Sequence, residues 1–148
     1  MATCWTNGMP KAEVTMDAKE YLGQYQLAEA ETEACYEQIA ALRDEATRMS
    51  AELSDMPGGG ECRDLDDIVA EMVDLRAELI ERIRRANQLR KEICDLIYSL
   101  EDERLIRLLH LRYVDCLKWK AVADKLGYEQ RYVHKLHGKA LRMLERGH

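Results

Sequence analysis

The chain has 148 residues and a formal net charge of -6, which suits one ordinary domain with enough length to bury a core. It contains no Phe, only two Pro and eight Gly, and 34% of its residues are charged. This composition disfavours sheets packed on an aromatic core and predicts an all-α fold rich in helical surface.

Metal and membrane sites have little support in the sequence. The five cysteines never form a C-x-x-C pair, and a structural zinc needs clustered ligands, so we expect no metal and no other cofactor. An odd cysteine count without a signal peptide indicates reduced thiols, and no window approaches the apolar length of a membrane span. We therefore expect a cytoplasmic protein that makes no membrane contact.

A long apolar stripe follows a short leader. Residues 1–15 contain Gly8 and Pro10 without helical periodicity, and we expect them to be disordered. From Asp17 to about residue 53, apolar or small residues then recur in alternating steps of four and three, which predicts a helix with one buried stripe. These residues are Tyr21, Tyr25, Ala28, Thr32, Cys35, Ile39, Leu42, Ala46, Met49 and Leu53.

A proline and three consecutive glycines interrupt this pattern within residues 54–63, which we interpret as a linker. The stripe resumes at Leu65, Ile68, Met72, Leu75, Leu79, Ile83, Ala86, Leu89, Ile93, Leu96 and Leu100. Two long helices joined by a short linker pack best in opposite directions, so residues 16–100 are predicted to form an antiparallel coiled-coil hairpin. Ile80, Ile97 and Tyr98 remain as apolar edges and favour a homodimer over a monomer.

Positive charge concentrates at the end of the chain. Residues 101–148 hold 11 Lys and Arg against 7 Asp and Glu, a net charge of +4, and from Lys118 onward the count is 8 against 3. A polyanion responds to local charge within a Debye length of about 8–10 Å, so the acidic total does not exclude nucleic-acid binding. A second cationic cluster, Arg82, Arg84, Arg85, Arg90 and Lys91, is either a solvated helix face or a phosphate contact.

The cationic tail has the periodicity of a helix-turn-helix. Trp119, Val122, Ala123 and Leu126 form one face of a short helix, and Val133, Leu136, Ala140, Leu141 and Leu144 form one face of a longer helix. Gly127 lies between them, where a tight turn requires a positive φ. A preceding stretch with Leu105, Leu108, Leu109 and Leu111 predicts a third helix, so residues 101–148 form the predicted C-terminal domain.

The outward side of the second tail helix supplies the candidate DNA-binding residues. Gln130, Arg131, His134 and Lys135 are expected near base edges, with Gly138 and Lys139 one turn further along. Lys118, Lys120, Lys125, Tyr132 and Arg142 are expected to contact the phosphate backbone. The alternative is a small helical bundle with a solvated cationic face.

The stretch "LRYVDCLKWKAVADKLGYEQRYVHKLHGKALRML" resembles the fourth conserved region of bacterial sigma factors. Matching residues are Leu111, Arg112, Tyr113, Trp119, Val122, Ala123, Leu126, Gly127, Val133, Ala140, Leu141 and Leu144. With the two long helices and the glycine linker, residues 18–144 are similar to RinA/ArpU-type phage and prophage regulators of late genes. Members commonly place Ser or Thr at the start of the second tail helix, where this chain has Glu129.

This resemblance implies a sequence-specific transcriptional regulator of phage late genes that binds double-stranded DNA and contacts RNA polymerase. No Ser or Cys has a nucleophile-elbow context, and the glycine-rich stretch lacks the Lys-Ser/Thr of a phosphate loop, so we expect no enzyme activity and no catalytic residue. One alternative is a phage structural, assembly or DNA-packaging adaptor with a coiled-coil oligomerisation region. Another is a protein that sequesters a polymerase subunit without touching DNA.

Overall fold

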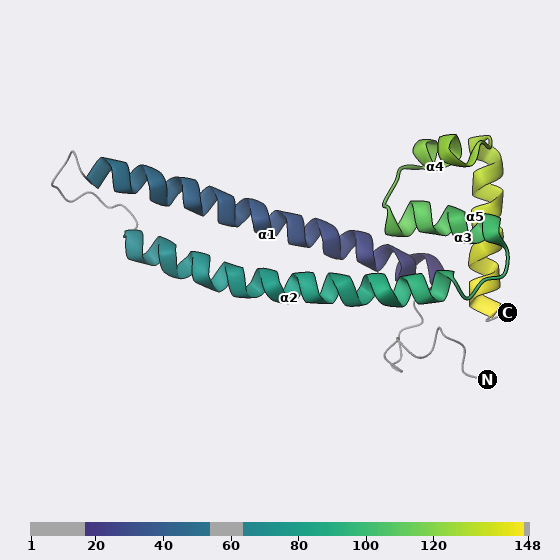
Figure 1. The fold of residues 1–148 in the computed structure, drawn as a ribbon, viewed down its shortest axis with the longest axis horizontal. Helices are drawn as coiled ribbons and strands as arrows, with labels where there is room; N and C mark the ends of the chain where they lie inside the picture. The colour runs from purple at the N-terminus through teal and green to yellow at the C-terminus, as the bar shows by residue number, and fades with distance from the viewer. Residues whose placement is uncertain (1–16, 54–63, 147–148) are drawn as a thin grey trace. The chain divides into compact units, whose positions relative to one another are not determined.

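All regular structure in the part of the chain that can be described is helical. The computed structural model describes residues 17–53 and 64–146, which contain five α-helices and one π-helical turn but no strand, as the composition predicted (Figure 1). The elements are α1 (Ala18–Leu53), α2 (Leu65–Ile97), α3 (Glu103–Leu109), η1 (His110–Val114), α4 (Trp119–Leu126) and α5 (Gln130–Arg146). The predicted leader at residues 1–15 and the predicted linker at 54–63 lie outside the described residues.

The described residues form two compact units. One unit comprises residues 28–86, and the other comprises residues 17–27 together with 87–146. The sequence pattern placed a boundary near residue 100, whereas the structure groups the ends of both long helices with the C-terminal helices. Leu22, Ile93 and Ile97 are fully buried in this second unit, so its core includes residues from the two long helices.

The burial of Ile97 corrects one expectation. We expected Ile80, Ile97 and Tyr98 to be apolar edges; Ile80 and Tyr98 are 56% and 58% exposed, but Ile97 is 0% exposed. The heptad pattern places Ile97 outside the stripe that α2 turns toward α1. It does not account for the C-terminal helices, which belong to the same unit as this end of α2.

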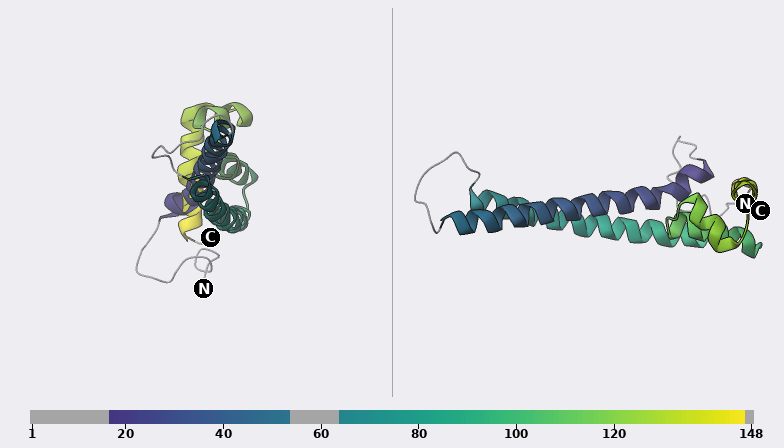
Figure 2. Two further views of the ribbon diagram at one scale, coloured as in Figure 1. Left: turned by 90° about the vertical axis from the view of Figure 1, so that its left-hand side faces the viewer. Right: turned by 90° about the horizontal axis from the view of Figure 1, so that it is seen from above.

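In the unit of residues 28–86, α1 and α2 run side by side in opposite directions (Figures 1 and 2). Arg82 Nη1 lies 3.1 Å from Glu31 Oε2, and further along α1 the Cys35 thiol donates to the carbonyl of Leu75 at 3.6 Å. Higher residue numbers on α1 therefore face lower numbers on α2. Cys35, Ile39 and Leu79 form a buried cluster against which Met72, Leu75 and Ile83 pack.

The stripe positions that the spacing selected are buried or half-buried from Tyr21 to Met49 on α1 and from Leu65 to Leu96 on α2. The buried members on α1 are Tyr21, Tyr25, Ala28, Thr32, Cys35, Ile39 and Leu42. On α2 they are Ile68, Leu79, Ala86, Ile93 and Leu96. Thr32 satisfies its hydroxyl by donating to the carbonyl of Ala28 at 2.8 Å, so its polar group adds no unpaired donor to the stripe.

In the C-terminal unit, α3 packs against α5, and α4 packs against both η1 and α5. Asp102 caps α3, because its carboxylate accepts from the backbone amide of Arg104 at 2.9 Å. The single third helix that the sequence predicted is divided between α3 and the π-helical turn η1. Leu105, Leu108 and Leu109 are fully buried, so this stretch does supply the apolar cover that we expected.

Gly127 ends α4 in the left-handed conformation, as predicted, with φ 74° and ψ 29°. Its amide donates to the carbonyl of Ala123 at 2.9 Å, and the next amide, of Tyr128, donates to the same carbonyl at 3.2 Å. Three residues, 127–129, then connect α4 to α5, and the carbonyl of Glu129 accepts from the amide of Val133 at 3.0 Å. The second tail helix therefore begins directly after Glu129.

We predict that Gly127→Ala destabilises the chain by about 1–2 kcal/mol, because a Cβ disfavours the left-handed conformation. No heavy atom lies within 4 Å of the Cβ position, so backbone strain alone is responsible. Urea denaturation measures the effect. Gly23→Ala is the matched control, since Gly23 also has no atom within 4 Å but lies inside a helix, where alanine stabilises by about 0.5–1 kcal/mol. Equal stabilities of Gly127→Ala and wild type would contradict the prediction.

Candidate nucleic-acid interface

Helix α5 has one buried face, and that face sets the direction of all its other side chains. Val133 and Ala140 are 0% exposed and Leu144 is 1% exposed, with Leu136 and His137 also buried. These positions repeat at helical spacing and pack against α3 and α4. The opposite side of α5 consequently faces away from the core of its unit.

Of the eleven residues that the sequence singled out for the DNA-binding surface, ten are exposed and Gly138 is half-buried. Tyr132 and Gly138 lie on α5, and Lys125 lies in the last turn of α4. Gln130, Arg131, His134, Lys135, Lys139 and Arg142 lie on α5, while Lys118 precedes α4 and Lys120 lies in its first turn. Lys118 and Lys120 therefore belong to the same compact unit as the candidate residues of α5.

Four of these cations and one that we had not singled out form a continuous row. Arg131, Lys135, Lys139, Arg142 and Arg146 follow one another at intervals of four, four, three and four residues, which keeps them on one side of a helix. All five are exposed. We call these five residues the basic row. Arg146 could have been recognised from its spacing to Arg142.

The basic row carries uncompensated charge. Among the described residues, the cations within 4.0 Å of a carboxylate are Arg82, Arg84, Lys91, Arg104 and His110, and none of them belongs to the basic row. Charge without a carboxylate partner extends into solvent and attracts polyanions. The row is therefore the strongest candidate anion surface among the residues that the structure describes.

The second cationic cluster differs from the basic row. Arg82 pairs with Glu31 and Glu78, Arg84 pairs with Glu81, and Lys91 lies 3.8 Å from Asp95. Nearby carboxylates compensate much of this positive charge, which favours the solvated-face interpretation over phosphate contact.

An aromatic cluster fixes α4, η1 and α5 against one another. The guanidinium of Arg112 lies 4.6 Å from the centre of the Trp119 ring and donates to the carbonyl of Leu117 at 2.8 Å. The rings of His134 and His137 each lie 4.6 Å from the Trp119 ring. His134 is thus exposed but already packed on one side, which limits how freely it can reach a ligand.

His137 is a buried histidine that the sequence analysis missed. Its Nε2 lies 2.7 Å from the hydroxyl of Tyr113, and the two rings stack with centres 5.7 Å apart. Burial and, to a lesser extent, the charges of Lys19, His134 and Arg112 together lower the pKa of His137 to about 4. Burial also raises the pKa of Tyr113 to about 12, so both rings are neutral at physiological pH.

Tyr132 has a structural contact that was not expected. Its hydroxyl accepts from Arg104 at 3.3 Å, and its ring meets that of Tyr128 edge-on at 5.1 Å. We expected Tyr132 to contact the phosphate backbone. Because Arg104 already binds its hydroxyl, a phosphate would have to share or replace this bond.

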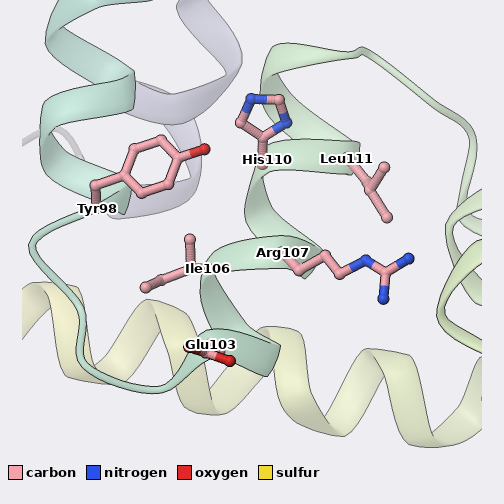
Figure 3. Close-up of a pocket in the computed structure, with 6 residues that line it drawn as sticks. All are labelled: Tyr98, Glu103, Ile106, Arg107, His110 and Leu111. Carbon is pink, nitrogen blue, oxygen red and sulfur yellow. The ribbon is translucent and has the colours of Figure 1, made fainter.

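A separate apolar hollow of about 510 Å³ lies over α3 and η1 (Figure 3). It is lined by Tyr98, Glu103, Ile106, Arg107, His110 and Leu111, with the rings of Tyr98 and His110 meeting edge-on at 6.1 Å. None of the predicted DNA-binding residues lines it.

Neither a metal site nor a membrane span is found in the part of the chain that the structure describes. Within residues 17–53 and 64–146, no three His, Cys, Asp or Glu side chains are grouped so as to hold a metal ion. None of the helices in these ranges has an apolar stretch that could cross a membrane.

The fold and this surface define an all-α protein whose last helix exposes a row of unpaired cations. The chain belongs to the DUF1492 family, described as a protein of unknown function, whose family model matches residues 37–145. No curated protein and no solved structure gives a significant match to the chain.

We predict that stability falls as the pH decreases from 6.5 toward 4. In this window the unfolded chain binds a proton on His137 that the folded chain, with its lowered pKa, excludes. The expected loss between pH 7 and pH 5 is roughly 1–2 kcal/mol from this residue. Urea denaturation at both pH values measures the loss for wild type and His137→Gln. The variant should lose this part of the pH dependence; an unchanged pH dependence would show that His137 does not cause it.

Proposed function

We propose that the protein is a non-enzymatic, sequence-specific DNA-binding regulator of transcription that acts in the cytoplasm of a bacterial host cell. In this proposal α5 lies in the major groove of double-stranded DNA. Gln130, Arg131, His134 and Lys135 contact base edges, and flanking lysines and arginines contact phosphates.

The observation that carries the proposal is the basic row opposite the buried face of α5. Its five cations are exposed and lie beyond 4.0 Å of every described carboxylate. Binding to DNA would neutralise this charge against phosphates and release counterions. Such a row is not expected on a helix face that is merely solvated, because like charges at positions i and i+4 destabilise an isolated helix.

We interpret α4 and α5 as a helix-turn-helix. Support comes from the short connection of residues 127–129, the left-handed Gly127 and the packing of α4 on α5. Residues near the start of α5 would then be the ones that reach base edges. Glu129 lies at this start and carries a negative charge, so it would select against close phosphates there.

We interpret α1 and α2 as an antiparallel coiled-coil hairpin that supports a homodimer. The support for the dimer is an apolar row on α2, in which Val69, Val73 and Ile80 are 48%, 60% and 56% exposed. Their spacing of four and seven residues keeps them on one side of the helix, separate from the buried stripe. Two copies would present two α5 helices to two half-sites.

The resemblance to RinA/ArpU-type regulators and to sigma-factor region four supports control of phage late genes and contact with RNA polymerase. Both remain parts of the proposal. The rival function is a phage structural, assembly or DNA-packaging adaptor, which predicts sequence-blind DNA binding and larger oligomers. A protein that sequesters a polymerase subunit predicts no salt-dependent DNA affinity.

Arg131→Ala should weaken binding to the preferred DNA site by about ten- to a hundredfold, because one bidentate contact to a base contributes about 1–3 kcal/mol. The site is first obtained by selecting bound fragments from the source genome. Fluorescence anisotropy then measures affinity at two salt concentrations. Residual binding of the variant should stay salt-sensitive, because its phosphate contacts remain.

The matched control is Arg48→Ala, which removes an exposed cation of α1 and should leave affinity unchanged. Loss of binding in both variants would indicate a general charge effect instead of base recognition. If no fragment is enriched but salt-dependent DNA binding is retained, the result would favour the assembly adaptor. Absence of all DNA binding would favour the polymerase-sequestering function.

Ile80→Glu should weaken self-association at least severalfold, since it places a charge in the exposed apolar row. Sedimentation equilibrium measures the change, and circular dichroism checks that the helices persist. Ala34→Glu, at an exposed position of α1, is the matched control and should associate like the wild type. A monomeric wild type would refute the dimer without affecting the DNA-binding proposal.

A further inference from the structure

Gly138 is a glycine inside a helix, where glycine is normally unfavourable. It lies near the middle of α5, which runs from Gln130 to Arg146. A glycine at an interior helix position destabilises by about 0.5–1 kcal/mol relative to alanine, because it loses more backbone freedom on folding. The chain therefore gives up stability at this position.

The fold itself does not require this glycine. Its φ is not in the left-handed region, since Gly127 is the described glycine with a positive φ. A Cβ built on Gly138 would meet Arg142 Nη1 at 3.5 Å, which is an ordinary contact with the end of a flexible side chain. An alanine would consequently fit the free protein without displacing any packed group.

Gly138 lies on the side of α5 that is proposed to bind DNA. It follows His134 by four residues and Lys135 by three, and it precedes Arg142 by four, so it lies among these exposed side chains on the same side of α5. Val133 and Ala140, on the buried face, lie on the other side of the helix. The centre of the surface proposed to bind DNA thus has no side chain of its own.

We infer that the backbone of α5 closely approaches the wall of the DNA groove at Gly138, an inference that rests on the proposed function. Without a Cβ, the helix backbone can reach van der Waals contact with the wall of the groove. The guanidinium of Arg142, which lies over this position in the free protein, moves onto a phosphate when the duplex arrives. A methyl group at this position would hold the helix away from the duplex. The contacts of all the neighbouring side chains with the DNA would then lengthen at the same time.

This inference requires that one substitution stabilise the protein and weaken binding at the same time. Gly138→Ala should raise the melting temperature by a few degrees, consistent with about 0.5–1 kcal/mol, and reduce affinity for the selected duplex about tenfold. Gly138→Leu should reduce affinity further, because leucine is a good helix former with a larger side chain. A steric cause predicts this order of affinities, whereas loss of helix would predict a lower melting temperature.

Gly23→Ala is the matched control, because Gly23 is also helical and has no atom within 4 Å of its Cβ position. It should raise the melting temperature and leave affinity unchanged. The experiment measures melting by circular dichroism and affinity by fluorescence anisotropy with the selected duplex.

Three outcomes would overturn the inference. Wild-type affinity in Gly138→Ala, with weakened binding in Arg131→Ala, would refute close approach at Gly138 while leaving the proposed function intact. A lower melting temperature of Gly138→Ala would show that the glycine serves the fold. No binding of any genomic duplex by wild type would refute the proposed function and this inference together.

Discussion

The buried face of α5 is the constraint on which the rest of the C-terminal unit depends. Val133, Ala140 and Leu144 are almost completely inaccessible and repeat at helical spacing, so the helix cannot turn about its own axis. A shift of one residue corresponds to about 100°, which would expose these apolar groups and move charged side chains toward the core. Burying a charge without a partner is far more unfavourable than exposing one apolar group. The direction of the basic row is therefore fixed by packing.

Apolar spacing was sufficient to predict the buried stripes and the inward face of α5, because helical geometry determines which residues share a side. Gly127 was equally predictable, since a turn with positive φ favours glycine over other residues. Ile97 was not predictable from the same pattern. The heptad rule describes how α2 meets α1, but the burial of Ile97 arises in the unit that also contains the C-terminal helices.

The candidate site was predictable only in part. The periodicity was sufficient to predict that the candidate side chains are exposed. It did not predict which of the cations have a carboxylate partner. Arg82 and Arg131 look alike in the sequence, yet Arg82 lies between two carboxylates, one of which comes from the other helix. His137 likewise depends on Tyr113, which is 24 residues away in the chain. Contacts between distant segments leave no local pattern.

The free α5 helix carries features that weaken it. Arg131 and Lys135, Lys135 and Lys139, and Arg142 and Arg146 are like-charge pairs four residues apart, each unfavourable by about 0.2–0.5 kcal/mol in an isolated helix. The interior glycine adds to this cost. The packed face and the aromatic cluster around Trp119 offset these penalties in the free protein.

A bound polyanion would remove the repulsion between the like charges, because each cation would gain a phosphate partner. Under the proposed function, α5 would therefore become more stable on binding. The cations that attract the DNA would be the same ones whose mutual repulsion is relieved by binding. An exposed helix face that binds no anion is expected to carry acidic residues between its cations, as α2 does around Arg82 and Arg84. The contrast between these two helices of one chain is the physical argument for the anionic partner proposed for α5.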